Sequence, residues 1–120
     1  MNDKPSAFDA QLDRVEANHQ PLTPLTFLKR SASVYPDKTA VIHGARRISY
    51  RDFYARARRL ASALARRGVG KGDTVAVMAS NIPAMLDAHY GVPMLGAVLN
   101  ALNIRLDAPT IAFILEHGDA

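Results

Sequence analysis

Four histidines and a few carboxylates are the first candidates for chemistry in this 120-residue sequence. The spacings H-x-x-x-H and H-E-x-x-H, which place two metal ligands on one helix face, do not occur. The sequence also contains no cysteine, which excludes thiolate metal sites and a cysteine nucleophile. A local metal site is therefore not predicted. The histidines are His19, His43, His89 and His117.

His89 deserves a separate interpretation because it lies in the most apolar part of the sequence, two residues after Asp87. Residues two apart on a helix point to different sides, so the two side chains are not expected to meet. We interpret His89 as a core or rim histidine with satisfied hydrogen bonds in preference to a catalytic base. Asp73, Asp87 and Asp107 are scattered with no predicted partner, and no G-x-S-x-G motif is present. The prediction for this segment is no catalytic, cofactor-binding or metal-binding residue.

A glycine-rich stretch at residues 68–74, GVGKGDT, superficially suggests a phosphate-binding loop. The spacing G-x-x-x-x-G-K-[ST] is absent, and the predicted order is helix, glycines, strand. A phosphate cradle needs the opposite order, with the glycines leading into a helix amino terminus. The glycines are therefore expected to end a helix and form a tight connection.

Six arginines on one predicted helix could form a phosphate-binding ridge. At 100° per residue they spread over half of the helix, and no aromatic residues lie among them. A solvated helix face is the better interpretation, and nucleic acid is not predicted as a partner. The arginines are Arg51, Arg56, Arg58, Arg59, Arg66 and Arg67.

Composition is that of an ordinary globular chain, with 48% hydrophobic residues, 22% charged residues and a formal charge of +4. The amino terminus is polar, and the long apolar region contains Asp87 and two prolines, so neither a signal peptide nor a transmembrane segment is predicted. A cytoplasmic location is the expectation. The length allows at most one domain.

The elements that would position any site follow from local patterns in the sequence. Residues 1–22 show no sustained period and are predicted to be a mobile leader and arm. Thr23 and Pro24 begin a short amphipathic helix that ends at Pro36. A hairpin is expected over residues 39–50, and Ser49, with Asp52 three positions on, caps a helix that runs to residue 67.

The second half of the chain predicts alternating strands and helices. Residues 74–79 and 98–102 are short apolar runs, expected to be strands of a parallel sheet covered on both faces. Between them, residues 83–96 form a buried helix that Asn81 caps and Pro93 bends or breaks. Residues 109–116 form a last helix. This order predicts an α/β protein in which residues 23–120 belong to one incomplete domain.

Several segments in order resemble the opening of AMP-forming acyl-CoA synthetases. The later segment HYGVPMLGAVLNALNIRLD, residues 89–107, resembles the branch of medium-chain fatty acid, methylmercaptopropionate and plant acyl-activating ligases. The resemblance covers about residues 22–120. The other segments are LTPLTFL at 22–28, YPDKTAVI at 35–42, SYRDF at 49–53, LASALA at 60–65, GVGKGDTVAV at 68–77 and SNIPAM at 80–85.

This resemblance implies an adenylate-forming ligase that converts a small carboxylic acid, ATP and coenzyme A into acyl-CoA, AMP and diphosphate, with Mg²⁺. The family's phosphate loop and catalytic lysine would lie beyond residue 120, so this segment is expected to be scaffold, the first part of the large amino-terminal domain, and inactive alone. A homodimer and the remainder of the same enzyme are the expected partners. The alternatives are a noncatalytic interaction module or truncated remnant and, less favoured, a basic nucleic-acid binder.

Overall fold

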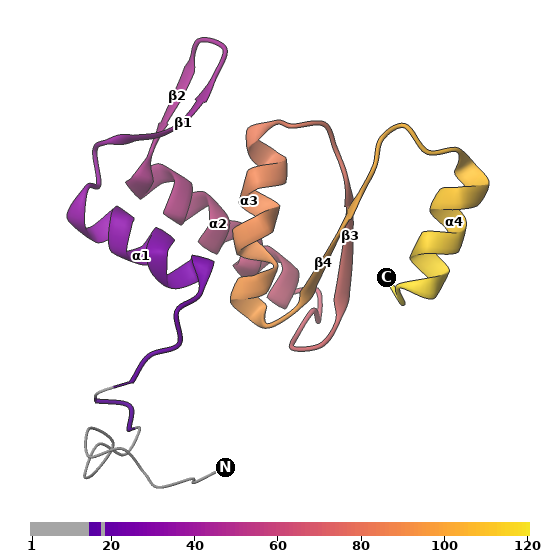
Figure 1. Cartoon of the computed structure of the whole chain (residues 1–120), viewed down its shortest axis with the longest axis horizontal. Helices are drawn as coiled ribbons and strands as arrows, with labels where there is room; N and C mark the ends of the chain where they lie inside the picture. Colours follow the sequence, from indigo (N-terminus) through magenta and orange to yellow (C-terminus); the bar gives the residue numbers. More distant parts are fainter. Residues whose placement is uncertain (1–14, 18) are drawn as a thin grey trace, which may run out of the picture.

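The computed structural model describes residues 15–17 and 19–120, and Figure 1 shows their arrangement. The helices and strands alternate as the sequence predicts for an α/β protein. In chain order the elements are α1 (Pro24–Val34), β1 (Thr39–His43), β2 (Arg46–Ser49), α2 (Tyr50–Ala65), β3 (Thr74–Met78), α3 (Pro83–Gly91), the 3-10 helix η1 (Pro93–Leu95), β4 (Val98–Leu102) and α4 (Ala108–His117).

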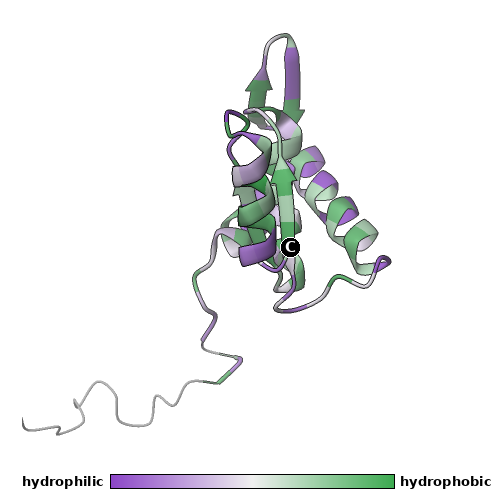
Figure 2. Cartoon of the chain, turned by 90° about the vertical axis from the view of Figure 1, so that its right-hand side faces the viewer, coloured by the Kyte–Doolittle hydropathy of each residue, from purple (hydrophilic) through white to green (hydrophobic). Residues whose placement is uncertain are grey.

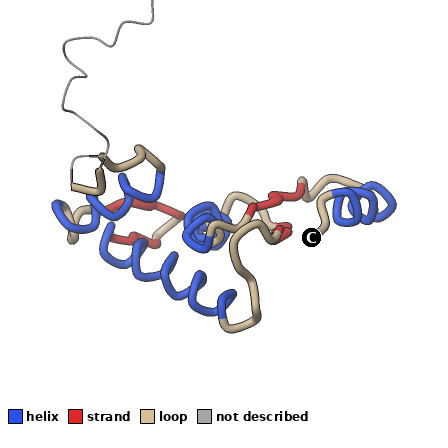
Figure 3. The backbone as a smooth tube through the Cα atoms, turned by 90° about the horizontal axis from the view of Figure 1, so that it is seen from below, coloured by secondary structure: helices blue, strands red, loops and turns tan. Residues whose placement is uncertain are grey.

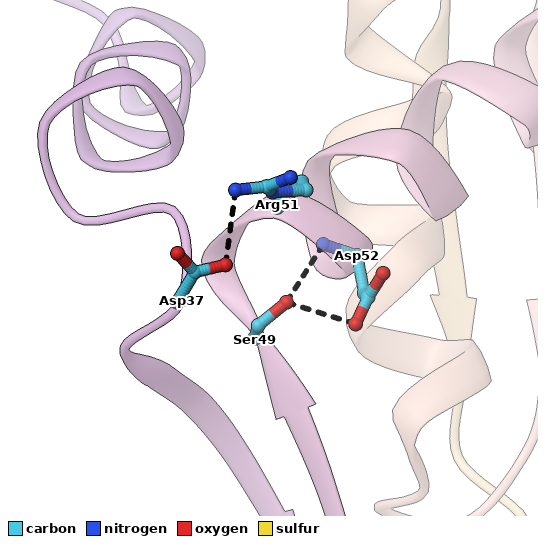
Figure 4. A network of polar contacts seen from close by, with 4 residues as sticks. All are labelled: Asp37, Ser49, Arg51 and Asp52. Atoms are coloured by element: carbon cyan, nitrogen blue, oxygen red, sulfur yellow. Dashed lines mark hydrogen bonds and ion pairs between the residues drawn. The ribbon is translucent and has the colours of Figure 1, made fainter.

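Side-chain caps explain why the first two long helices begin where they do. Thr23 and Thr26 form a reciprocal capping box, in which each hydroxyl accepts the backbone N–H of the other residue, at 3.4 and 3.3 Å. At α2 the Ser49 hydroxyl accepts the Asp52 N–H at 3.1 Å and donates to the Asp52 carboxylate at 2.8 Å, as Figure 4 shows. The predicted cap at Ser49 is confirmed, and α2 ends at residue 65, two residues before the predicted end.

Two small sheets hold the strands. β1 and β2 form an antiparallel hairpin, and β3 pairs with β4 in parallel from Thr74 opposite Val98 to Met78 opposite Leu102. This pairing confirms the predicted parallel strands. The predicted break at Pro93 is also confirmed, because α3 ends at Gly91 and η1 follows. Asn81 does not cap α3. The cap residue is Ile82, whose side chain makes no capping hydrogen bond.

The β3–β4 pair is less covered than the sequence predicted. In Figures 1 and 3 the two strands lie between α3 and α4. No residue of α4 is buried, so α4 shields its side of the strands poorly, and Met78 and Val98 are more than half exposed. The prediction that both faces are covered is therefore wrong for the part of the chain that the structure describes.

Helix α4 itself is apolar and exposed. It begins one residue before the predicted start, and its cap is Asp107, whose carboxylate accepts the Thr110 N–H at 3.1 Å. Hydrogen bonds from the side chain and backbone of Thr110 lower the pKa of Asp107 because they stabilise the carboxylate. Figure 2 shows hydrophobic residues on this surface helix, and the Phe113 side chain stacks on the His117 ring while remaining 64% exposed.

The core lies where α1, α2, α3 and the hairpin meet. Its buried centre consists of Leu28, Ile48, Phe53 and Ala57. The Phe53 ring meets the Tyr90 ring edge-on, with ring centroids 5.0 Å apart. A Cβ at Gly91 would lie 2.9 Å from the Ala57 carbonyl oxygen, so a glycine lets α2 and α3 approach this closely.

A buried ion pair joins the same two helices. Arg56 of α2 donates from Nε to Asp87 Oδ1 at 3.2 Å and from Nη2 to Asp87 Oδ2. The Asp87 side chain is only 10% exposed and that of Arg56 is 25% exposed. The prediction that Asp87 has no partner is therefore wrong. The prediction that Arg56 belongs to a solvated helix face is wrong for the same reason. The predicted leader at residues 1–22 falls mostly outside the described residues.

Candidate functional site

A cleft opens at the carboxyl ends of the parallel strands β3 and β4. The chain leaves β3 through Ser80 and Asn81 and leaves β4 through Asn103, and these loops meet the side of α3 that carries His89. Ligands of open α/β sheets bind at this edge. The cleft has a volume of about 540 Å³, and its full lining is Ala79, Ser80, Asn81, Met85, His89, Ala101, Leu102, Asn103 and Ile104. We call it the His89 cleft.

His89 is held in one orientation at the rim of this cleft. Its Nδ1 lies 2.8 Å from the backbone carbonyl oxygen of Met85, one turn earlier on α3. A carbonyl oxygen only accepts, so Nδ1 carries a proton, and in the tautomer with this single proton Nε2 is an acceptor. This hydrogen bond agrees with the sequence-based interpretation of His89 as a core or rim histidine, and its noncatalytic role stays a prediction.

Asn103 contributes a second oriented polar group. Its Oδ1 accepts the Arg105 N–H at 3.0 Å, which turns the loop after β4. Within the described part of the chain, its Nδ2 has no hydrogen-bond partner. The cleft therefore contains one fixed acceptor at His89 and one amide donor at Asn103. Sequence reasoning missed Asn103, although its position directly after a predicted parallel strand was a usable signal.

An apolar groove adjoins the His89 cleft and shares Asn81, Met85 and His89 with it. This groove has a volume of about 510 Å³ and lies between the hairpin and α3. Its remaining lining residues are Pro24, Val41, Ile42, His43, Ile82, Pro83, Leu86 and Tyr90. No lysine, arginine, aspartate or glutamate lines either hollow in the described residues. Both hollows are therefore suited to an uncharged ligand.

The other residues singled out from the sequence are not brought to this cleft. Gly68 and Gly72 have φ of +89° and +92°, and they connect the end of α2 to β3 as predicted. The Asp73 carboxylate accepts the Gly70 N–H at 2.7 Å within that connection. His43 lines only the apolar groove, and His117 lies on α4. His19 lies directly after residue 18, which the structure does not describe, and it lines neither hollow.

The arginines of α2 form several separate contacts. Arg51 pairs with Asp37 at 3.0 Å, and both of these side chains are mostly exposed (Figure 4). Arg66 donates to the Ser62 hydroxyl at 2.7 Å and Arg67 to the Ala63 carbonyl at 3.2 Å. The helix face is solvated, as predicted, except at Arg56. The expectation that no aromatic residue lies among the arginines is wrong, because the Arg58 guanidinium lies 5.7 Å from the centre of the Tyr54 ring. These contacts position arginines along α2 without gathering them into one ridge.

The described residues contain neither a metal-binding cluster nor a membrane-spanning helix. Residues 15–17 and 19–120 contain no group of three or more histidine, aspartate or glutamate side chains placed to hold a metal ion. None of the helices in this part of the chain combines the length and the apolar composition that crossing a membrane requires.

Comparison with known proteins places this chain in a family. The model of the AMP-binding enzyme family matches residues 28–120, which is most of the chain. The chain therefore belongs to the AMP-binding enzyme family. This confirms the resemblance to adenylate-forming enzymes that the sequence motifs indicated.

Particular relatives narrow this assignment. The chain is 58% identical over 109 residues to the peroxisomal acetate/butyrate–CoA ligase of Arabidopsis thaliana, covering 91% of this chain and 19% of that enzyme. It is 52% identical over 109 residues to an acetate–CoA ligase of Humulus lupulus, again covering 91% of this chain and 19% of the enzyme. The chain thus spans about a fifth of the length of these relatives.

A solved structure supports the same fold. The fatty acyl CoA synthetase of Mycobacterium tuberculosis superposes with a TM-score of 0.75 at 34% identity, covering 80% of this chain and 20% of that protein. The chain therefore has the fold of part of a CoA ligase, and the expected fold class is confirmed.

Proposed function

We propose that this chain is the amino-terminal part of an AMP-forming carboxylic acid–CoA ligase, which converts an acid, ATP and coenzyme A into acyl-CoA, AMP and diphosphate. The observation that carries the proposal is the 58% identity with an acetate/butyrate–CoA ligase over 109 residues. We propose a short-chain monocarboxylic acid as the substrate, because these relatives are an acetate/butyrate–CoA ligase and an acetate–CoA ligase. The medium-chain branch indicated by the sequence motifs is compatible with a slightly longer acid.

The proposed reaction must activate a carboxylate, which is a poor electrophile. A carboxylate resists nucleophiles because it is charged and stabilised by resonance, so it must first become a mixed anhydride with a good leaving group. ATP supplies AMP for that purpose, and Mg²⁺ with cationic side chains stabilises the charge on the phosphates. The described residues do not fit a Mg²⁺ site, because they contain no suitable group of ligands. We assign this segment a structural role in the adenylation step.

Acid-dependent exchange of pyrophosphate into ATP tests the proposal. We expect the natural protein that carries this segment to exchange labelled pyrophosphate when butyrate or acetate is present, and to release AMP when coenzyme A is added. Omission of the acid is the control. Failure of every acid from two to eight carbons to support exchange would contradict the ligase and favour the noncatalytic interaction module.

We also propose a cytoplasmic location, because these 120 residues contain no cysteine and therefore no part of the disulfide framework that is typical of secreted proteins. Relatives with the word peroxisomal in their names make the peroxisome the competing compartment. Fluorescence microscopy of the tagged natural protein distinguishes the two. We expect diffuse fluorescence, and punctate fluorescence that coincides with a peroxisomal marker would contradict this proposal.

A further inference from the structure

The apolar groove between the hairpin and α3 leaves large hydrophobic side chains open to water. Ile42 of β1 is 64% exposed and Ile82, just before α3, is 38% exposed, and both line the groove. No lysine, arginine, aspartate or glutamate of the described residues lines it. Such a groove favours an apolar occupant, because covering Ile42 and Ile82 removes hydrophobic area from water.

The arm that precedes α1 begins at the rim of this groove. Pro24 is the first residue of α1 and also lines the groove. Val15 precedes Pro24 by nine positions, and an extended chain of that length reaches roughly 30 Å. The match to the acetate/butyrate–CoA ligase spans 109 of the 120 residues, so it includes part of the arm before residue 22. The arm is therefore long enough to enter the groove, and a relative shares part of it.

The sequence of the arm contains the pattern of a short amphipathic helix. Phe8, Leu12 and Val15 are spaced by four and three residues, a spacing that places side chains on one helix face. Three apolar residues do not make a sustained period, and so short a helix is marginal in water without a surface to pack on. At the end of the pattern the His19 N–H donates to the Val15 carbonyl oxygen at 2.9 Å, which is the spacing of an α-helical hydrogen bond.

Charge favours the same placement of the arm. On a helix Asp9 and Asp13 would lie on the side next to the apolar face. Arg46 of β2 is opposite His43 in the hairpin, so its side chain lies on the same face of the hairpin as this groove-lining residue. Arg46 is exposed, and no carboxylate of the described residues pairs with it. The acidic side of the arm would supply such a partner.

We propose that residues 8–15 bind in the apolar groove as one amphipathic helix, with the apolar face toward Ile42 and the acidic side toward Arg46. The arm then covers the hairpin and α3 with a segment of the same chain. This proposal does not depend on the ligase function, because it concerns only how the chain packs on itself.

Trypsin digestion of the natural protein tests this placement, because Arg14 is a cleavage site within the proposed helix. A docked helix is cut only when it opens, so the rate of cleavage reports the open fraction. Leu12→Asp puts a charge on the apolar face, and we expect it to raise the rate of cleavage after Arg14 about tenfold. The matched control Ala10→Asp puts the same charge on the opposite face and should change this rate by less than about twofold.

Substitutions of Ile42 test the groove and leave the sequence around the cleavage site unchanged. We expect Ile42→Asp to raise the rate of cleavage after Arg14 about tenfold, with no change at sites elsewhere in the chain. If the aspartate unfolds the hairpin, the test uses Ile42→Ser, which removes the apolar contact without adding a charge. We expect about a threefold rise for this variant.

Three results would overturn the proposal. Cleavage of the unsubstituted protein as fast as that of a synthetic peptide of residues 1–22 would show that the arm is not docked. A faster cleavage in Leu12→Asp but in neither Ile42 variant would show that the arm binds elsewhere. If another part of the protein fills the groove, the Ile42 variants will lower the melting temperature without faster cleavage after Arg14.

Arg46→Gln tests the acidic side of the helix separately. We expect about a threefold faster cleavage after Arg14, because an exposed ion pair is a weak interaction. In a protein that already carries Asp9→Asn and Asp13→Asn, the same substitution should have no effect. The control Arg59→Gln removes an exposed arginine of α2 and should change nothing. An equal rise for Arg46→Gln in both backgrounds would overturn the proposed orientation of the arm.

Discussion

Replacing Arg56 by methionine is expected to lower the free energy of unfolding by about 3–5 kcal/mol, because it leaves a buried carboxylate without its charged partner. The Asp87 side chain is 10% exposed and receives two hydrogen bonds from the Arg56 guanidinium. Methionine keeps most of the aliphatic stem of the arginine, so little packing is lost. Urea unfolding of the natural protein measures the loss in free energy of unfolding. Intrinsic fluorescence and the protease sensitivity of this segment are the two readouts.

Two further variants make this prediction specific to the ion pair. Arg59→Met removes an exposed arginine from the same helix and should change stability by less than about 0.5 kcal/mol. The double variant Arg56→Met with Asp87→Leu removes both charges and should recover most of the lost stability. Equal losses in Arg56→Met and Arg59→Met would show that the pair contributes nothing particular.

Replacing Phe53 by alanine should have an effect of similar size, about 3–5 kcal/mol, for a different reason. Phe53 is 5% exposed at the centre of the core, where its ring contacts the Tyr90 ring edge-on. Alanine would remove this contact and leave a cavity between α2 and α3 that the helix backbones cannot close. The same unfolding measurement in urea reports the change.

Phe113 supplies the matched control for that prediction. It is also a phenylalanine on a helix, but its side chain is 64% exposed. Phe113→Ala should therefore cost much less than Phe53→Ala in the same measurement. A comparable cost in the natural protein would show that a part of the protein outside this segment covers α4 there. A small effect of Phe53→Ala would contradict the core described above.

Local signals in the sequence predicted most of the secondary structure. Ser49 and Thr23 were identified as caps because a hydroxyl before an apolar-periodic run has a direct bonding role in the first helical turn. Pro93 was identified as a break because proline has no N–H to donate. Asn81 failed as a cap because the chain remains extended through Ile82 before α3 begins.

Contacts between elements were harder to predict. Arg56 and Asp87 are 31 positions apart, and nothing near either residue indicates that α2 and α3 pack with these side chains facing each other. The predicted burial of β3 and β4 was too high. An apolar composition shows that a strand can be buried, but the described residues do not cover both faces of these two strands. Asn103 and His89 meet in one cleft only through the parallel pairing of the strands.

The parallel pair β3–β4 also has a consequence for synthesis. The described strands pair only with each other, so each has an outer edge whose backbone groups find no strand partner within the described chain. Such edges pair readily with strands of other molecules. In a protein as long as its relatives, about four-fifths of the chain would still be untranslated when this segment leaves the ribosome. During that interval these edges would be open to pairing with strands of other molecules.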